Sequence, residues 1–201
     1  DCGLIHQLGE WVLRRACEDV AAMDVGEDFS LAVNVSVRQL KHPQFEQGVM
    51  SVLAETGFDP RRLEFEITES ALFHGAEAAT GAVQRLGRHG IRFSLDDFGT
   101  GYSSLSYLKN LPINTLKIDR AFIKDICIDV KDKQIVSALI SMAHSMDMRV
   151  VAEGVERTST HLTTEISQRW KSAVGVITVG DHLRAGARRR VAARTTRRRG
   201  S

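Results

Sequence analysis

The chain has 201 residues, of which 43% are hydrophobic and 26% are charged, a composition typical of globular proteins. This length is enough for one domain with its own core. No apolar run approaches the roughly 20 residues that cross a bilayer, and no secretory leader begins the chain. We therefore expect no membrane segment and a cytoplasmic location. The cysteines Cys2, Cys17 and Cys127 form no CxxC pair, which argues against a disulfide framework.

The net charge of +2 conceals a division of the sequence near residue 156. Residues 157–201 contain 11 Lys/Arg and two Asp/Glu, which gives +9, whereas residues 1–156 contain the other 16 basic and 23 acidic residues, which gives −7. This predicts a folded domain over 1–156 and a basic tail over 157–201 that is disordered or translated out of frame. Aromatic residues are nearly absent between the tail's arginines, so we expect no nucleic-acid partner.

In chain order, the sequence first predicts an amphipathic helix over residues 4–23, because apolar residues recur at three- and four-residue spacing. Short apolar runs then alternate with helical patterns. We expect strands at residues 31–35, 63–67, 91–95, 114–118 and 149–152, and helices at residues 39–56, 76–89, 103–110 and 133–146. Successive strands start 32, 28, 23 and 35 residues apart, which is the period of βα units.

Repeated βα units form either an open doubly wound sheet or a barrel. Polar residues at the C-terminal ends of the five predicted strands favour the barrel. An open sheet concentrates its site at one switch point, whereas a barrel gathers residues from many strands on one rim. We therefore predict an α/β, TIM-barrel-like (βα) repeat domain. The rim residues are Asn34, Glu66, Asp96, Asp97, Lys117, Asp119 and Glu153.

Gathering four carboxylates, those of Glu66, Asp96, Asp97 and Glu153, in one cavity is costly unless a cation joins them. Oxygen ligands, with the amide of Asn34, suit Mg²⁺ or Mn²⁺ rather than zinc. Adjacent acids at a strand's end can each reach one ion, which favours a pair of metals and attack at phosphorus. Lys117 can hold a water or a phosphate oxygen, and Glu153 can accept a proton from that water.

The acid pair is followed by a glycine-rich segment, residues 98–104, which we interpret as a candidate lid over the metals. Its central residues are Thr100 and Gly101. Glu69, three residues after Glu66, is placed to anchor this segment through Thr100 or a serine hydroxyl.

These motifs, taken together, resemble the successive signatures of the EAL domain. They are Asn-Val-Ser at 34–36, Glu-Ile-Thr-Glu-Ser at 66–70, Asp-Asp-Phe-Gly-Thr-Gly-Tyr-Ser-Ser-Leu at 96–105, Leu-Lys-Ile-Asp at 116–119 and Val-Ala-Glu-Gly-Val-Glu at 151–156. The resemblance implies a modified TIM barrel that hydrolyses cyclic di-GMP to the linear dinucleotide pGpG with two Mg²⁺ or Mn²⁺ ions.

The resemblance also implies residue roles. Asn34, Glu66 and Asp96 would bind metal, Asp97 would serve the second metal, Lys117 would position water and Glu153 would be the general base. Glu69 and Glu156 resemble the supporting acids of the family, and Asp119 ends the Leu-Lys-Ile-Asp motif.

The sequence departs from the family at both ends. It contains no Glu-Ala-Leu motif, whose Glu is a metal ligand, and no match to a later Gln of the site. We therefore expect an incomplete barrel with open edges, prone to self-association or forming a homodimer. Two alternatives to the phosphodiesterase stay open: an inactive module that binds cyclic di-GMP or a partner protein, and a non-functional gene fragment.

Overall fold

The computed structural model describes residues 2–23, 25–26, 29–69, 76–99, 108–109, 111–126, 128–153 and 174–177. For residues 2, 3, 76–78 and 174–177 it describes the backbone only. In the described part of the chain, six strands form one parallel sheet in the order β1-β2-β3-β4-β5-β6. The strands are β1 (Leu31–Asn34), β2 (Leu63–Thr68), β3 (Arg92–Phe98), β4 (Thr115–Ile118), β5 (Arg149–Glu153) and β6 (Val174–Ile177).

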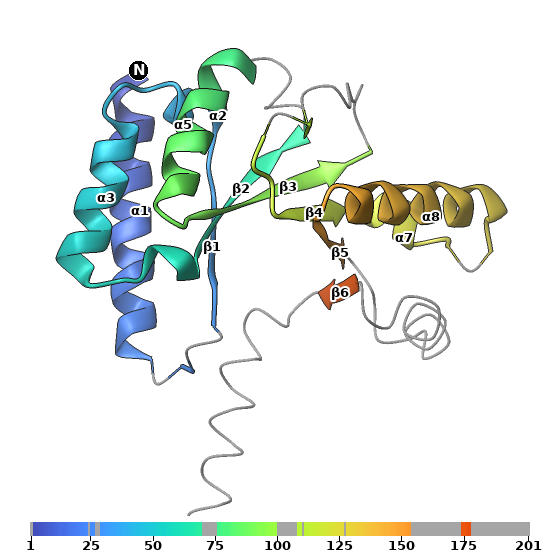
Figure 1. The fold of residues 1–201 in the computed structure, drawn as a ribbon. Helices are drawn as coiled ribbons and strands as arrows, with labels where there is room; N and C mark the ends of the chain where they lie inside the picture. Colours follow the sequence, from blue (N-terminus) through green and yellow to red (C-terminus); the bar gives the residue numbers. More distant parts are fainter. Residues whose placement is uncertain are drawn as a thin grey trace, which may run out of the picture.

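Helices separate most of these strands along the chain, as the βα period predicts. The helices are α1 (Cys2–Ala22), α2 (Val37–Leu40), α3 (Phe45–Thr56), α5 (Ala76–Arg88), α7 (Arg120–Ile123) and α8 (Val130–Ser145), with a 3-10 turn at Pro60–Arg62. Helices α1, α3 and α5 lie together beside β1 and β2, and α7 and α8 lie at the opposite end, near β4 and β5 (Figure 1). None of the described helices combines the length and apolar character that a bilayer span requires.

The α/β, TIM-barrel-like prediction is confirmed, because every strand pairs in parallel with the next strand along the chain. Within the described residues, hydrogen bonds do not close the sheet, since β1 and β6 each pair on one side only. All five predicted strands are present within three residues of their expected ends.

One helix prediction needs correction, and one short helix is not predicted. The single helix expected at residues 39–56 is wrong, because α2 ends at Leu40 and α3 begins at Phe45. Pro43 lies between them; it has no N–H to donate and disfavours helical geometry in the residue before it. The short helix α7 is not predicted from its apolar pattern; it follows Asp119, whose Oδ1 accepts a hydrogen bond from the Ala121 N–H at 2.7 Å. Most of the helix expected at 103–110 lies outside the described residues.

The core lies between one face of the sheet and the helices. Alternate residues of β2, namely Leu63, Phe65 and Ile67, are at most 2% exposed, and the same alternation buries Phe93 and Leu95 of β3. These side chains pack with buried residues of the helices in one continuous cluster. The period of two sends the remaining side chains, including Glu64 and Glu66, to the opposite face of the sheet. The apolar face therefore fixes the register that assembles a polar face, which would be the inside of a barrel.

Candidate metal and catalytic centre

Lys117 lies at the centre of the acidic residues on the polar face. Its Nζ is 3.0 Å from Oε1 of Glu66, 3.0 Å from Oδ1 of Asp96 and 2.7 Å from Oε1 of Glu153. The lysine is on β4, and the three acids come from β2, β3 and β5. Four strands thus deliver one ammonium and three carboxylates to a single point, as the rim hypothesis predicts.

The Lys117 side chain is only 7% exposed, so its charge is removed from most of the solvent. Burial by itself lowers the pKa of this ammonium, but the hydrogen bonds and charges of Glu153, Glu66 and Asp96 outweigh burial and raise the pKa well above its usual value. Lys117 therefore keeps its proton at neutral pH and acts as a fixed positive charge.

Asp97 is brought to the same region by an unusual backbone turn. Its φ is +55°, and the pairing between β3 and β4 shifts register between Leu95 and Phe98. The Asp97 N–H donates to Oδ1 of Asp96 at 3.1 Å. A left-handed residue costs roughly 1–2 kcal/mol, less for Asp than for most residues. The expected turn at the end of the strand is therefore a bulge inside β3, which continues to Phe98.

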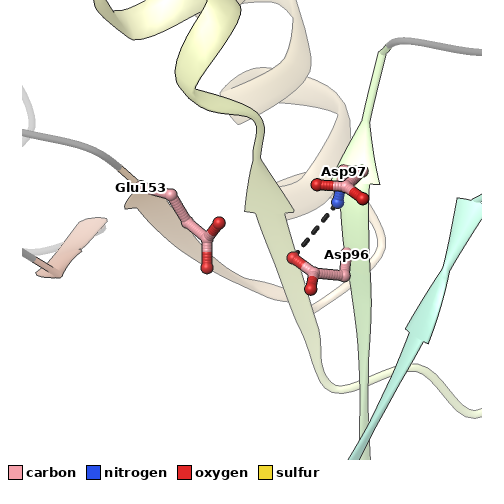
Figure 2. Close-up of side chains that lie close together, drawn as sticks. All are labelled: Asp96, Asp97 and Glu153. Carbon is pink, nitrogen blue, oxygen red and sulfur yellow. Dashed lines mark hydrogen bonds between the residues drawn. The ribbon is translucent and has the colours of Figure 1, made fainter. Parts of the chain in front are cut away.

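Asp96, Asp97 and Glu153 form a group that is suited to a metal ion. Each offers one carboxylate oxygen, and these oxygens lie within 4.8 Å of one another. Figure 2 shows Asp96 and Asp97 on β3 and Glu153 reaching toward them from the end of β5. Burial, followed by the charges of Asp96 and Asp119, raises the pKa of Asp97. The negative charges that contribute to this shift, after burial, are ones that a bound cation would offset.

The donor set fits divalent cations of the Mg²⁺, Mn²⁺ or Ca²⁺ type. Its ligands are carboxylate oxygens, and hard cations prefer such ligands. When all are ionised, five carboxylates and the ammonium of Lys117 carry a formal charge of −4. The carboxylates are those of Glu66, Asp96, Asp97, Asp119 and Glu153. Two divalent ions would neutralise this charge.

Glu69 secures the segment that follows the acid pair. This carboxylate is 1% exposed, and its Oε2 accepts a hydrogen bond from the Gly99 N–H at 2.8 Å. The predicted anchors, Thr100 and the serines that follow it, lie outside the described residues and stay a prediction; the described partner of Glu69 is the backbone amide immediately before Thr100. A bond to a backbone amide holds the chain whatever side chains follow it.

Of the other predicted site residues, the structure describes Asn34 and Asp119. Asn34 ends β1, with its Cα opposite that of Glu66, and it also lines a cavity between α1 and β1. Asp119 caps α7 and lies close enough to Asp97 to raise its pKa. Thr100, Gly101 and Glu156 lie outside the described residues, and their roles stay predictions.

A second ionic layer, below the first, is not anticipated from the sequence. Arg149 Nη2 lies 3.4 Å and Arg92 Nε 3.8 Å from Oε2 of Glu64, and Arg92 also donates to the Ser30 hydroxyl. Glu64 is two residues before Glu66, and each arginine is four residues before a site acid of its own strand. Steps of two along each strand place these residues on the same face as the rim acids, but their pairing depends on the register between strands.

Comparison with known proteins identifies a family. The EAL domain profile matches residues 1–164. The bifunctional diguanylate cyclase/cyclic di-GMP phosphodiesterase MucR of Pseudomonas aeruginosa is 41% identical over 175 residues, which cover 86% of this chain and 24% of MucR. The chain likewise spans only about a fifth of the length of the other curated relatives at the top of this comparison.

Solved structures agree with this assignment. The MucR phosphodiesterase in complex with c-di-GMP aligns with a TM-score of 0.73 and 41% identity, covering 82% of this chain and 68% of that structure. A manganese/cyclic di-GMP complex of BlrP1 from Klebsiella pneumoniae aligns with a TM-score of 0.70 and 27% identity, covering 75% of this chain and 38% of that structure.

Proposed function

The chain belongs to the EAL domain family, and on this premise we propose that it hydrolyses cyclic di-GMP to linear pGpG in the cytoplasm, using two Mg²⁺ or Mn²⁺ ions. The observation that carries the proposal is the arrangement of Asp96, Asp97 and Glu153, with oxygens within 4.8 Å of one another, beside the buried ammonium of Lys117. Relatives named as cyclic di-GMP phosphodiesterases, and neighbours solved with cyclic di-GMP and manganese, support the substrate and the type of cofactor.

In this proposal the carboxylates of Asp96 and Asp97 would each hold an ion, and Glu66 and Asn34 would supply further oxygen ligands. Divalent ions bound there would offset the charge of the phosphate and lower the pKa of water. The bulge at Asp97 allows both Asp96 and Asp97 to act as ligands, because it turns the two consecutive carboxylates toward one site.

Lys117 and Glu153 carry the proton and charge chemistry. Lys117, which keeps its proton, directs an N–H toward the attacking water or a phosphate oxygen. Glu153 accepts the proton of that water. Of the three carboxylates that contact Lys117, its side chain is the most exposed, at 29%. The water oxygen bonds to phosphorus, one P–O3′ bond breaks, and the released 3′ oxygen takes up a proton from solvent. The ring opens to a dinucleotide with one 5′-phosphate and one remaining phosphodiester.

Chromatography of the products tests the proposal. The 201-residue chain, incubated with cyclic di-GMP and Mn²⁺, should release pGpG, and E153Q should lower the rate by about 10²–10⁴-fold. The matched control is E55Q, because Glu55 is an exposed acid of α3 that pairs with Arg14 far from the site. Equal rates for E153Q and the wild type would contradict the role of Glu153, and absence of pGpG would contradict the reaction.

A second candidate is an inactive module that binds cyclic di-GMP. The sequence contains no Glu-Ala-Leu motif, so one acidic ligand that the family resemblance implies has no counterpart here. Calorimetry separates the two candidates: heat of binding without formation of pGpG selects the second candidate, and turnover selects the first.

A further inference from the structure

The backbone that follows the acid pair is held from two sides at Gly99. On one side, its N–H donates to the buried carboxylate of Glu69 at 2.8 Å. On the other side lies the ring of Phe122, from α7. A Cβ built on Gly99 would lie 2.7 Å from Cε2 and 3.1 Å from Cζ of that ring. The Gly99 φ of +102° is also one that other residues rarely adopt. The ring thus rests directly on a bare Cα.

This contact lies two residues from the turn that the metal site depends on. A left-handed Asp97 persists only where its surroundings fix the backbone. Two fixed points among the described residues are Phe98, which is 2% exposed in the core, and Gly99, which is held between Glu69 and Phe122. Without the ring, Gly99 would lose one of these two contacts, and the chain could relax toward ordinary strand geometry. Regular alternation would then turn Asp97 away from Asp96.

Helix α7 is built to keep the ring in place. Its first turn is capped by the side chain of Asp119, and Ile123, next to Phe122, is 1% exposed in the core. Phe122 itself is partly buried and packs against the same core. Because α7 follows directly from β4, the strand that carries Lys117 also sets the position of the ring.

We infer that Phe122 is a positioning residue for the metal site: its ring supports Gly99 and so holds the turn that directs Asp97 to the same side as Asp96. This inference rests on the proposed function, since it takes Asp97 as a metal ligand. Phe122 touches neither metal nor substrate in this role; it acts through the backbone.

The test measures Mn²⁺ affinity directly, by calorimetry on the 201-residue chain without substrate. F122A should weaken Mn²⁺ binding by about tenfold, the lower end of what supporting residues of metal sites contribute. The matched control is L53A, which removes a core side chain of α3 that is 3% exposed and takes no part in holding α7, with thermal unfolding recorded for both variants. If F122A does not fold, F122L makes the same comparison. Equal losses of affinity in the Phe122 and Leu53 variants, or no loss in the Phe122 variant, would overturn the inference.

A double substitution tests the contact itself. G99A should weaken Mn²⁺ binding because its Cβ displaces the ring, and G99A/F122L should recover part of that loss because the smaller side chain makes room. Strictly additive losses would count against the contact. A chain that binds Mn²⁺, responds to F122A and yet forms no pGpG would contradict the proposed reaction while supporting this inference. A wild-type chain that binds no Mn²⁺ would overturn the inference itself.

Discussion

Lys117 and Asp97 respond in opposite ways to the same acidic surroundings. The neighbouring carboxylates stabilise the charged form of Lys117 and raise its pKa, whereas burial and the charges of Asp96 and Asp119 disfavour the charged form of Asp97. Lys117 therefore already supplies part of the positive charge that the polar face requires. Asp97 still requires an added cation to favour its charged form. The residues of the site are therefore arranged so that an added positive charge stabilises them.

K117M tests this balance. The substitution keeps the apolar stem of the side chain but leaves Glu66, Asp96 and Glu153 without their ammonium partner, so without metal it should destabilise the fold by about 3 kcal/mol at neutral pH. Urea unfolding measures the difference. The control is K131M, at an exposed position of α8, which should change stability by less than about 0.5 kcal/mol. Similar effects of the two substitutions would show that the buried ion cluster does not stabilise the metal-free fold.

Cys17 gives a prediction at alkaline pH. Burial raises the pKa of this thiol from 9.0 to about 11. Between these two values the folded chain keeps a proton that the unfolded chain has released, so stability falls as pH rises through this window. The full loss is about 2–3 kcal/mol. Urea unfolding at pH 8.5 and 10.5 should show a smaller fall for C17A than for the wild type, and the same fall in both would contradict the prediction.

At the level of elements, the sequence predicts strands better than it predicts contacts. The starts of β1, β2 and β5 are as expected, because apolar residues at successive or alternate positions mark each strand. The extension of β3 through Asp96, Asp97 and Phe98 is missed, because two acids in a row look like the end of a strand. The break between α2 and α3 was signalled by Pro43, whose effect the helical spacing obscured.

The candidate site likewise has a part that the sequence predicts and a part that it does not. The ends of the predicted strands and the motifs predict which residues lie together at the rim. The structure does bring together four of them, Glu66, Asp96, Lys117 and Glu153. The support of Gly99 by Phe122, and the pairing of Glu64 with Arg92 and Arg149, depend on register and helix position. Neither is encoded in a local pattern, so the sequence alone could not predict them.

The contact between α1 and α2 offers a test in which two effects oppose each other. Replacing Gly9 by Ala should favour helix α1 by about 1 kcal/mol. However, the new Cβ would overlap Nε2 of Gln39, and Gln39 is not free to move. Its Oε1 accepts from the Ser36 hydroxyl at 2.7 Å and from the Ser36 N–H at 3.0 Å, which closes the cap of α2. Overpacking of this kind costs about 1–3 kcal/mol.

We therefore expect G9A to destabilise the chain by about 1 kcal/mol, measured by thermal or urea unfolding, because overpacking outweighs helix propensity. G48A is the matched control, since a Cβ on Gly48 of α3 meets only Glu10 at 3.7 Å, an ordinary contact, and it should stabilise by about 1 kcal/mol. In a Q39A background, G9A should become stabilising. A stabilising G9A in the wild-type background would show that Gln39 yields at little cost.

For the whole molecule, the extent of the sheet bears on where the domain ends. The family match runs to residue 164, eight residues past the predicted boundary at 156, and the backbone of β6 pairs with β5 at residues 174–177. Backbone pairing of this kind does not depend on particular side chains. The division at 156 stays a prediction, and so does self-association, although the described sheet has two strands that pair on one side only.

A divalent cation should stabilise the whole fold and not only the site. The candidate carboxylate ligands lie on β2, β3 and β5, so they are spread over more than 80 residues of chain and meet only in the folded state. An ion that binds only the folded chain raises the free energy of unfolding by about 2.7 kcal/mol at a concentration 100 times its Kd. Thermal unfolding should therefore shift upward with Mn²⁺ or Mg²⁺ and return to its starting value with a chelator. Sodium chloride at equal ionic strength separates binding from screening, and D97N should remove most of the shift because it takes one carboxylate from the cluster. An equal shift in D97N would place the bound ion elsewhere, since no ion held by the Asp96–Asp97–Glu153 group can be indifferent to the loss of one of its three charges.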